Sequence, residues 1–187
     1  MSLLELRAVA CVRGGRLLFE ALDLVLEPGA TALVTGPNGA GKSSLIRLAA
    51  GLLPAASGTV ARGGGATLAD EALALDPKLS LARALGFWSR LDGADPAAAM
   101  AAMGLMPLAG VPVRMLSTGQ RKRAALARAL ASGAPLWLLD EPANGLDDDG
   151  QARLEAAIAA HRAGGGAILA ASHQSFAVPG AARVALG

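Results

Sequence analysis

The segment that most constrains the fold is GPNGAGKSS, residues 36–44, which fits the phosphate-loop pattern G-x-x-x-x-G-K-[ST]. It follows the apolar run TALVTG and precedes KSSLIRLAAGLL, a helix pattern that ends near Gly51 and Pro54. A strand, a glycine-rich loop and a helix in this order are the context in which such a loop binds phosphate. The alternative is a glycine-rich turn in an unrelated α/β protein, and the complete strand–loop–helix context argues against it.

Each residue type in this loop has a physical role in binding a polyphosphate. Glycines permit backbone angles that turn successive N–H groups inward, and the helix N-terminus adds free amides and a favourable dipole. Lys42 is expected to reach the β- and γ-phosphates, and the Ser43 hydroxyl is expected to bind Mg²⁺. The predicted nucleotide-binding residues of the loop are Gly36, Pro37, Asn38, Gly39, Ala40, Gly41, Lys42, Ser43 and Ser44.

A second chemical signal is the acidic end of the apolar run PLWLLDEP. Ligand sites of parallel sheets lie at the carboxyl ends of strands. Asp140 is therefore predicted to hold Mg²⁺ and Glu141 to orient or deprotonate the attacking water. His173 follows the run AILAAS and is predicted to lie near the γ-phosphate if that strand neighbours PLWLLD. The alternatives are a solvated strand end and a simple polar cap.

The remaining patterns predict an α/β fold with a mostly parallel sheet covered on both faces, because strand patterns alternate with helix patterns. Two alternating segments, LLELRAVACVR and GGRLLFEALDLVLEPG, predict strands at the N-terminus, and SGTVARGGGATLA predicts a hairpin or strand pair. Residues 76–117 contain two helix patterns and no convincing strand, so a helical insert interrupts the sheet.

Composition excludes several classes of protein. The 187 residues suit one domain, and a single cysteine, Cys11, rules out an internal disulfide framework. The longest apolar stretch is interrupted by glycine and proline, and the N-terminus lacks a signal-peptide pattern. We therefore expect a soluble, cytoplasmic chain. A formal charge of +2 and few aromatic residues argue against a nucleic-acid partner.

The segment LSTGQRKR precedes a strong helix former, AALARALAS, and Ser117 or Thr118 is a natural N-cap for it. The first turn then carries Arg121, Lys122 and Arg123, although cations oppose the helix dipole there. Either an anion binds at this helix start, or the three side chains face solvent or a partner carboxylate.

Taken in order, GPNGAGKS, LSTGQ, LLDEP, NGLD and SH resemble the motifs of the ATP-binding subunits of ABC transporters, over nearly the whole chain. The resemblance implies a phosphate-loop NTPase fold of the ABC type, with an antiparallel N-terminal β part and a parallel core sheet. It implies one ATPase domain over residues 1–187 with a helical insert over about 76–130. The implied activity is ATP hydrolysis with Mg²⁺, coupled to transport.

The resemblance also implies how two subunits work together. A head-to-tail homodimer would form composite ATP sites, with LSTGQ of one subunit facing the γ-phosphate held by the other. Ser117, Gly119 and Gln120 would bind that phosphate, NGLD would be the D-loop, and His173 would be the switch histidine.

Two positions depart from the pattern of the family. Arg13 occupies the place of an aromatic residue that stacks on adenine, and a guanidinium can also stack on an aromatic plane. Glu71 stands where the Q-loop glutamine is expected, and its carboxylate could approach Mg²⁺ while changing the charge of the site.

Among short ABC subunits, the chain most resembles the ATP-binding components of haem exporters in bacterial cytochrome c biogenesis. This resemblance implies integral membrane partner subunits, a peripheral position on the cytoplasmic face of the plasma membrane, and no direct haem binding. Residues 78–115 would form the docking face, and Phe87 and Trp88 are either contacts there or ordinary helix packing. The alternatives are an ABC transporter for lipid, peptide or metal, and a soluble ABC-type ATPase acting on DNA or ribosomes.

Overall fold

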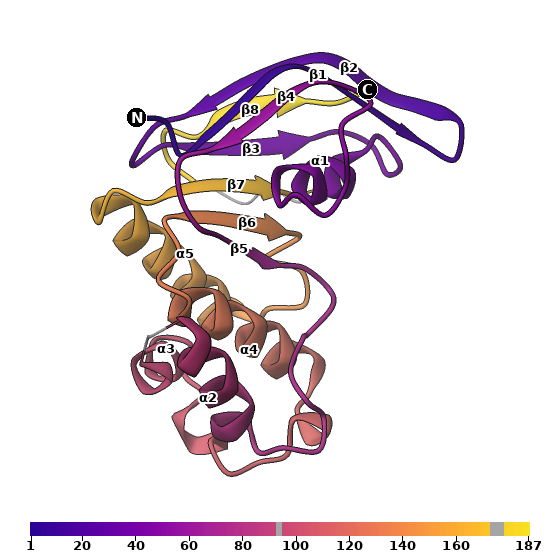
Figure 1. The fold of residues 1–187 in the computed structure, drawn as a ribbon. Helices are drawn as coiled ribbons and strands as arrows, with labels where there is room; N and C mark the ends of the chain where they lie inside the picture. The colour runs from indigo at the N-terminus through magenta and orange to yellow at the C-terminus, as the bar shows by residue number, and fades with distance from the viewer. Residues whose placement is uncertain (93–94, 173–177) are drawn as a thin grey trace.

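The computed structural model describes residues 1–92, 95–172 and 178–187. Two β-sheets form the upper part of the molecule in Figure 1, and a group of helices extends below them. The predicted α/β class is confirmed, with a parallel sheet of five strands and an antiparallel sheet of three. In the described part of the chain, no helix has the length and apolar character needed to cross a membrane.

The antiparallel sheet has the order β2-β1-β4 and contains most of the N-terminal segment. Its strands are β1 (Leu4–Arg13), β2 (Arg16–Leu26) and β4 (Ser57–Arg62). The β1–β2 turn is a two-residue hairpin in which Gly14 and Gly15 both have positive φ, at 55° and 77°. Glycine removes the steric cost of such angles, so the sequence fixes this turn locally.

The parallel sheet has the order β5-β6-β7-β3-β8. Its members are β3 (Thr31–Thr35), β5 (Ala66–Ala69), β6 (Leu136–Asp140), β7 (Ala167–Ala171) and β8 (Ala182–Ala185). Every pairing between them is parallel. The carboxyl ends of β3, β7 and β6 therefore lie side by side at one edge, which is where the predicted site residues begin.

The predicted pairing within SGTVARGGGATLA is wrong, although both strands exist. β4 pairs with β1 in the antiparallel sheet, whereas β5 pairs with β6 in the parallel sheet. The glycines at 63–65 carry the chain from one sheet to the other instead of closing a tight turn. Each strand forms the edge of a different sheet instead of pairing with its sequence neighbour.

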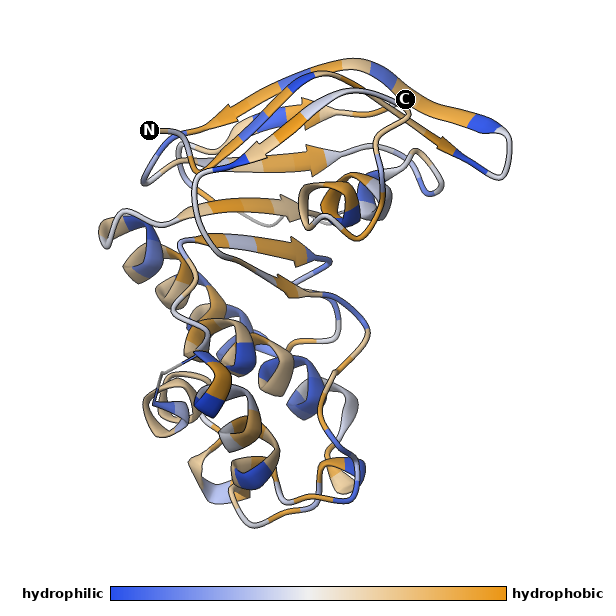
Figure 2. Ribbon diagram, in the orientation of Figure 1, coloured by the Kyte–Doolittle hydropathy of each residue, from blue (hydrophilic) through white to orange (hydrophobic). Residues whose placement is uncertain are grey.

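The parallel sheet is covered on both faces, and the alternation of side chains along β6 shows how. Leu136 and Leu138 pack in a cluster with the antiparallel sheet and with helix α1 (Lys42–Ala49). Trp137 and Leu139 pack in the opposite cluster, against the helices. Figure 2 shows hydrophobic residues concentrated along these central strands.

The helices of the second face are α4 (Thr118–Ala131) and α5 (Asp148–Ala163). Helices α2 (Leu81–Asp92) and α3 (Pro96–Ala102) pack on α4, away from the sheets (Figure 1). Two short 3₁₀ turns, Met106–Leu108 and Val113–Met115, then lead the chain back to α4. Both helix patterns predicted between residues 76 and 117 are therefore present.

Candidate functional site

The predicted phosphate loop connects the end of β3 to the start of α1. It lies at the edge of the sheet where β6 and β7 also end. Lys42 is buried, and its amine donates hydrogen bonds to the carbonyl oxygens of Gly36 at 2.8 Å and Pro37 at 3.1 Å. The amine is thereby held over the loop, where it can meet an anion bound to the loop amides.

Two glycines in the loop are required by close approach as well as by backbone angle. Gly36 has φ of 145°, and a Cβ there would overlap the Leu186 carbonyl oxygen. Gly41 has φ of 105° and begins α1, and a Cβ there would lie 3.1 Å from Cβ of Leu18. No described side chain caps this helix start, so its first amides remain available to an anion.

A pocket of about 230 Å³ lies over the loop. It is lined by Leu18, Asn38, Gly39, Gly41, Lys42, Ser43, Ser44 and Glu141. The predicted residues Gly36, Pro37 and Ala40 shape the loop without lining this pocket, and Arg13 does not line it either. Leu18 of β2 does, and the sequence analysis missed it, because an apolar strand residue carries no chemical signal of its own.

Asp140 lies buried at the end of β6, close to Ser43. Burial raises the pKa of this carboxyl, and the neighbouring Ser43 hydroxyl is the main opposing influence. Its Oδ1 atom is buried without a hydrogen-bond partner. An orphaned carboxylate oxygen beside a hydroxyl group fits a divalent cation at this point.

Such a cation would need ligands from outside the protein. Among the described residues, no group of three or more His, Cys, Asp and Glu side chains gathers to hold a metal ion. Mg²⁺ is commonly held by one or two protein oxygens together with the phosphates of a bound nucleotide. Ser43 and Asp140 match that pattern.

Glu141 has φ of +48°, a conformation that is unfavourable for a residue with a side chain. Its backbone N–H donates a 2.8 Å hydrogen bond to the Ala171 carbonyl oxygen at the end of β7. That bond fixes the turn after β6 against the neighbouring strand. Glu141 lines the loop pocket and also a second pocket, so it lies between the two pockets.

The second pocket, of about 360 Å³, contains the other predicted acidic residue, Glu71. It is lined by Asp70, Glu71, Leu73, Thr118, Arg121, Lys122, Ala125, Glu141 and Asn144. The structure therefore brings Glu71 together with Glu141, whereas Ser43 lines only the loop pocket. His173 lies outside the described residues, but the strand before it, β7, does pair with β6 as its predicted role required.

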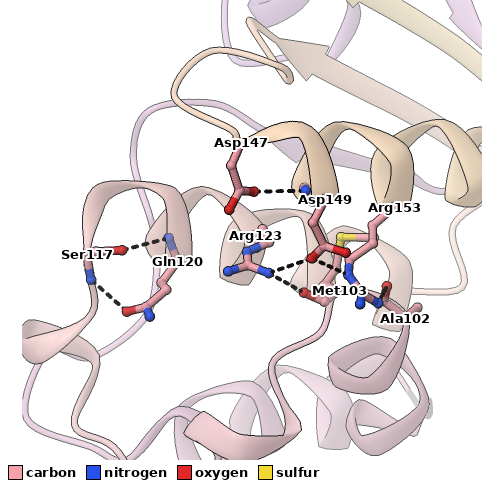
Figure 3. A network of polar contacts seen from close by, with 9 residues as sticks. Ala102, Met103, Ser117, Gln120, Arg123, Asp147, Asp149 and Arg153 are labelled. Carbon is pink, nitrogen blue, oxygen red and sulfur yellow. Dashed lines mark hydrogen bonds and ion pairs between the residues drawn. The ribbon is translucent and has the colours of Figure 1, made fainter.

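The helix start in LSTGQ is closed by a reciprocal cap (Figure 3). Ser117 Oγ accepts a hydrogen bond from the Gln120 backbone N–H at 3.3 Å. The Gln120 side-chain oxygen accepts one from the Ser117 backbone N–H at 2.9 Å. Ser117 is thus the N-cap, and Gln120 has a structural role that the sequence analysis did not assign.

The three cations of the first turn have internal partners. The Arg121 guanidinium donates to the Leu116 carbonyl oxygen at 2.9 Å, and Lys122 donates to the Asp140 carbonyl oxygen at 3.2 Å. Arg123 lies 3.4 Å from a carboxylate oxygen of Asp149. The crowding of charge in the sequence does not persist in space, because the side chains point to different acceptors.

The NGLD segment packs against the start of α4 and leads into α5. A Cβ on Gly119 would lie 3.0 Å from the Gly145 carbonyl oxygen, so the two segments are in close contact. Asp147 caps α5 by accepting from the Gly150 N–H at 2.9 Å, and Asp149 then bridges Arg123 and Arg153 (Figure 3).

The two aromatic residues of α2 differ in their surroundings. The Trp88 indole N–H donates to the Ala74 carbonyl oxygen at 2.7 Å, and the Arg128 guanidinium lies 5.1 Å from the centre of its ring system. Phe87 is 49% exposed. Trp88 is therefore used in internal packing, and Phe87 is available at the surface of the described chain.

The chain is similar in sequence to known proteins of one family. Residues 19–144 match the ABC transporter family. The chain is 60% identical to the cytochrome c biogenesis ATP-binding export protein CcmA of Sphingopyxis alaskensis, over 99% of this chain and 97% of that protein. It is 57% identical to the protein of the same name in Novosphingobium aromaticivorans, over 91% and 88% of the two chains.

Solved structures show the same fold. A putative ABC transporter ATP-binding protein from Pyrococcus furiosus has a TM-score of 0.85 and 21% identity, over 98% of this chain and 96% of that chain. A putative metal-chelate type ABC transporter in an inward-facing conformation has a TM-score of 0.81 and 23% identity. It is matched over 100% of this chain and 79% of that chain.

Proposed function

Because the chain belongs to the ABC transporter family, we propose that it is the ATP-hydrolysing subunit of an exporter in cytochrome c biogenesis. The proposed ATP hydrolysis is supported by the arrangement of Lys42, Ser43 and Asp140 at one edge of the sheet. The proposed role in export is supported by the 60% identity over nearly the full length of both chains.

In the proposed reaction, the phosphates of ATP lie in the pocket over residues 36–44. Lys42, already held over the loop by two carbonyl oxygens, binds the phosphates with its ammonium group. The open N-terminus of α1 stabilises their negative charge. When bound, Mg²⁺ would supply charge neutralisation at the phosphates, with Ser43 and Asp140 as the residues that hold it.

Glu141 is proposed as the residue that orients or deprotonates the attacking water, since it lines the loop pocket together with Ser43. The turn that carries it is fixed by its backbone hydrogen bond to Ala171, so the backbone of Glu141 is held at the end of β6. His173 is proposed to assist near the γ-phosphate, and Glu71 to approach the cation from the adjoining pocket. Arg13 is proposed to stack on the adenine.

The second half of each ATP site is proposed to come from another copy of this chain. Ser117, Gly119 and Gln120 would face the γ-phosphate held by the partner copy, and residues 144–147 would lie at the interface. In support, the start of α1 lies at the loop pocket of this subunit, whereas the start of α4 does not line that pocket.

As a transporter subunit, the chain would work with membrane partner subunits on the cytoplasmic face of the membrane. The proposed docking region is residues 78–115, with exposed Phe87 as a contact. We propose haem as the exported compound, handled by the partner subunits, so that this chain supplies the energy without binding haem. One ATPase domain over residues 1–187, with a helical insert over about 76–130, is the proposed organisation.

The test is made in cells. The native protein is replaced with Glu141→Gln, and covalently bound haem in the c-type cytochromes is measured. The proposal predicts loss of that haem while the variant remains at the membrane. The matched control is Glu155→Gln, because Glu155 is exposed on α5 and far along the helix from the site. Normal haem attachment in the Glu141→Gln strain would contradict a role in haem export.

A further inference from the structure

Lys122 is a half-buried lysine that no motif of the family pattern explains. Its amine donates a 3.2 Å hydrogen bond to the backbone carbonyl oxygen of Asp140, 18 residues along the chain. It therefore joins the first turn of α4 directly to the end of β6. The carbonyl that it holds belongs to the peptide group that leads into Glu141.

The surroundings of this amine are acidic. Asp70, Glu71 and Glu141 line the same pocket as Lys122, and Asp140 is bonded to it through its carbonyl oxygen. Burial lowers the pKa of Lys122, while Asp140, Glu71, Glu141 and Asp70 each act to raise it. The negative charges of these four carboxylates therefore favour the protonated form of the amine.

Two cations, Arg121 and Lys122, line this pocket. Arg121 lines the pocket, but its guanidinium donates to the Leu116 and Arg114 carbonyl oxygens. Arg47 lies 3.8 Å from Asp70 and does not line the pocket. Within the residues that the structure describes, Lys122 is the lining cation whose charged group is directed to the end of β6.

We propose that Lys122 is a positioning residue for ATP hydrolysis, which fixes the strained turn at Glu141 and offsets the negative charge of Glu71. This inference rests on the proposed ATPase function. Because Glu141 has φ of +48°, its turn needs external restraints, and the bonds from Glu141 to Ala171 and from Lys122 to Asp140 hold it on two sides. Without the ammonium group, the turn would lose one restraint and the carboxylates would repel one another.

The experiment uses the transporter complex, purified from membranes through a tag on this chain, with ATP turnover and apparent ATP affinity measured for each variant. Lys122→Met keeps the length of the side chain and removes its charge. We expect kcat to fall about tenfold while KM for ATP changes less than about twofold, because the phosphate loop is untouched. Lys122→Arg restores the charge and is expected to return kcat to within about threefold of the wild type.

The coupling to Glu71 is tested by a double-mutant cycle. Glu71→Gln keeps the shape of the side chain and removes its charge, and its own turnover is the reference for the double variant. In that background, Lys122→Met is expected to cost less than about threefold. An equal fold loss of turnover for Lys122→Met in both backgrounds would contradict the offsetting role.

Three further outcomes would overturn the positioning role. Lys122→Met could keep the wild-type kcat, or Lys122→Arg could lose as much kcat as Lys122→Met. The third is a rise in KM for ATP in Lys122→Met as large as its loss of kcat. Arg183→Met is the control, since it removes one positive charge from an exposed position on β8. Thermal unfolding of each variant separates a loss of fold from a loss of positioning. Absence of ATP turnover in the wild-type complex would instead contradict the proposed function itself.

Discussion

The two helix starts that carry motifs, α1 and α4, are built in opposite ways. Helix α1 has Gly41 as its N-cap with no side-chain hydrogen bond, so its first amides remain available beside the loop pocket. Helix α4 begins at Ser117 with a reciprocal cap in which Gln120 takes part. The first start is open to an anion within this chain, whereas the second already has two of its polar groups satisfied.

The charged side chains follow the same contrast. Lys42, at the first position of α1, is buried and held over the loop that it serves. The cations in the first turn of α4 bind three separate acceptors, which are the Leu116 carbonyl oxygen just before the N-cap, the Asp140 carbonyl oxygen and the Asp149 carboxylate. An open start at α1 and a capped start at α4 are compatible with the proposal that α4 meets a phosphate only across an interface with a second subunit.

The largest expected effect comes from the open helix start. Lys42→Ala removes a buried charge that would contact the phosphates, and such a loss costs about a hundredfold or more in affinity. We expect nucleotide binding, measured with a fluorescent ATP analogue, to be lost. Arg183→Ala, a change at an exposed cation, should bind normally. Normal ATP turnover by Lys42→Ala would remove the phosphate-loop assignment.

The next effect separates binding from chemistry at the same site. Glu141→Gln keeps the phosphate loop intact and removes the proposed base, so turnover should fall about 100- to 10,000-fold while ATP binding is retained. Steady-state hydrolysis and equilibrium binding are measured on one preparation, with Glu155→Gln as the matched control. Unchanged turnover would exclude Glu141 as the base.

A smaller effect tests the capped helix start. Ser117→Ala and Gln120→Ala each remove one side of the reciprocal cap, and each should lower stability by about 1 kcal/mol. Ser117→Ala also removes a hydroxyl proposed to reach a phosphate, so its turnover should be about tenfold lower than that of the wild type. Wild-type turnover of Ser117→Ala would leave Ser117 with a capping role alone.

The smallest effect is expected for the surface ion pairs that join the first turns of α4 and α5. Asp149 bridges Arg123 and Arg153, but its side chain is 58% exposed, so solvent screens both ion pairs. Asp149→Asn should leave the thermal midpoint unchanged within the error of the measurement. A clear drop would show that this network holds α4 and α5 together more strongly than its exposure indicates.

Much of the site was predictable because its signals are local. The phosphate loop, the acidic strand end and the Ser117 cap each depend on a few neighbouring residues, and the parallel sheet follows from alternating strand and helix patterns. The pairing of β4 and β5 was not predictable in this way, because it depends on which strand edges are free after the sheets form. No local sequence pattern indicates which strand edges are free.

Lys122 and Leu18 show the same limit at the level of side chains. The cations after Ser117 form one cluster in the sequence, yet each points to a different acceptor, since the helix is placed by packing against β5 and the other helices. Leu18 lines the loop pocket because the β1–β2 hairpin lies over Gly41. Both contacts join residues that are far apart in the chain, and no local pattern indicates them.

The most direct test of the central claim is the mass of the Glu141→Gln protein in solution, measured by sedimentation with and without saturating MgATP. If the capped start of α4 completes its site on a phosphate held by another copy, the protein should be a monomer without ATP and a dimer with it. Adding Lys42→Ala to the same chain should abolish the dimer. A monomer in saturating MgATP would contradict the shared site.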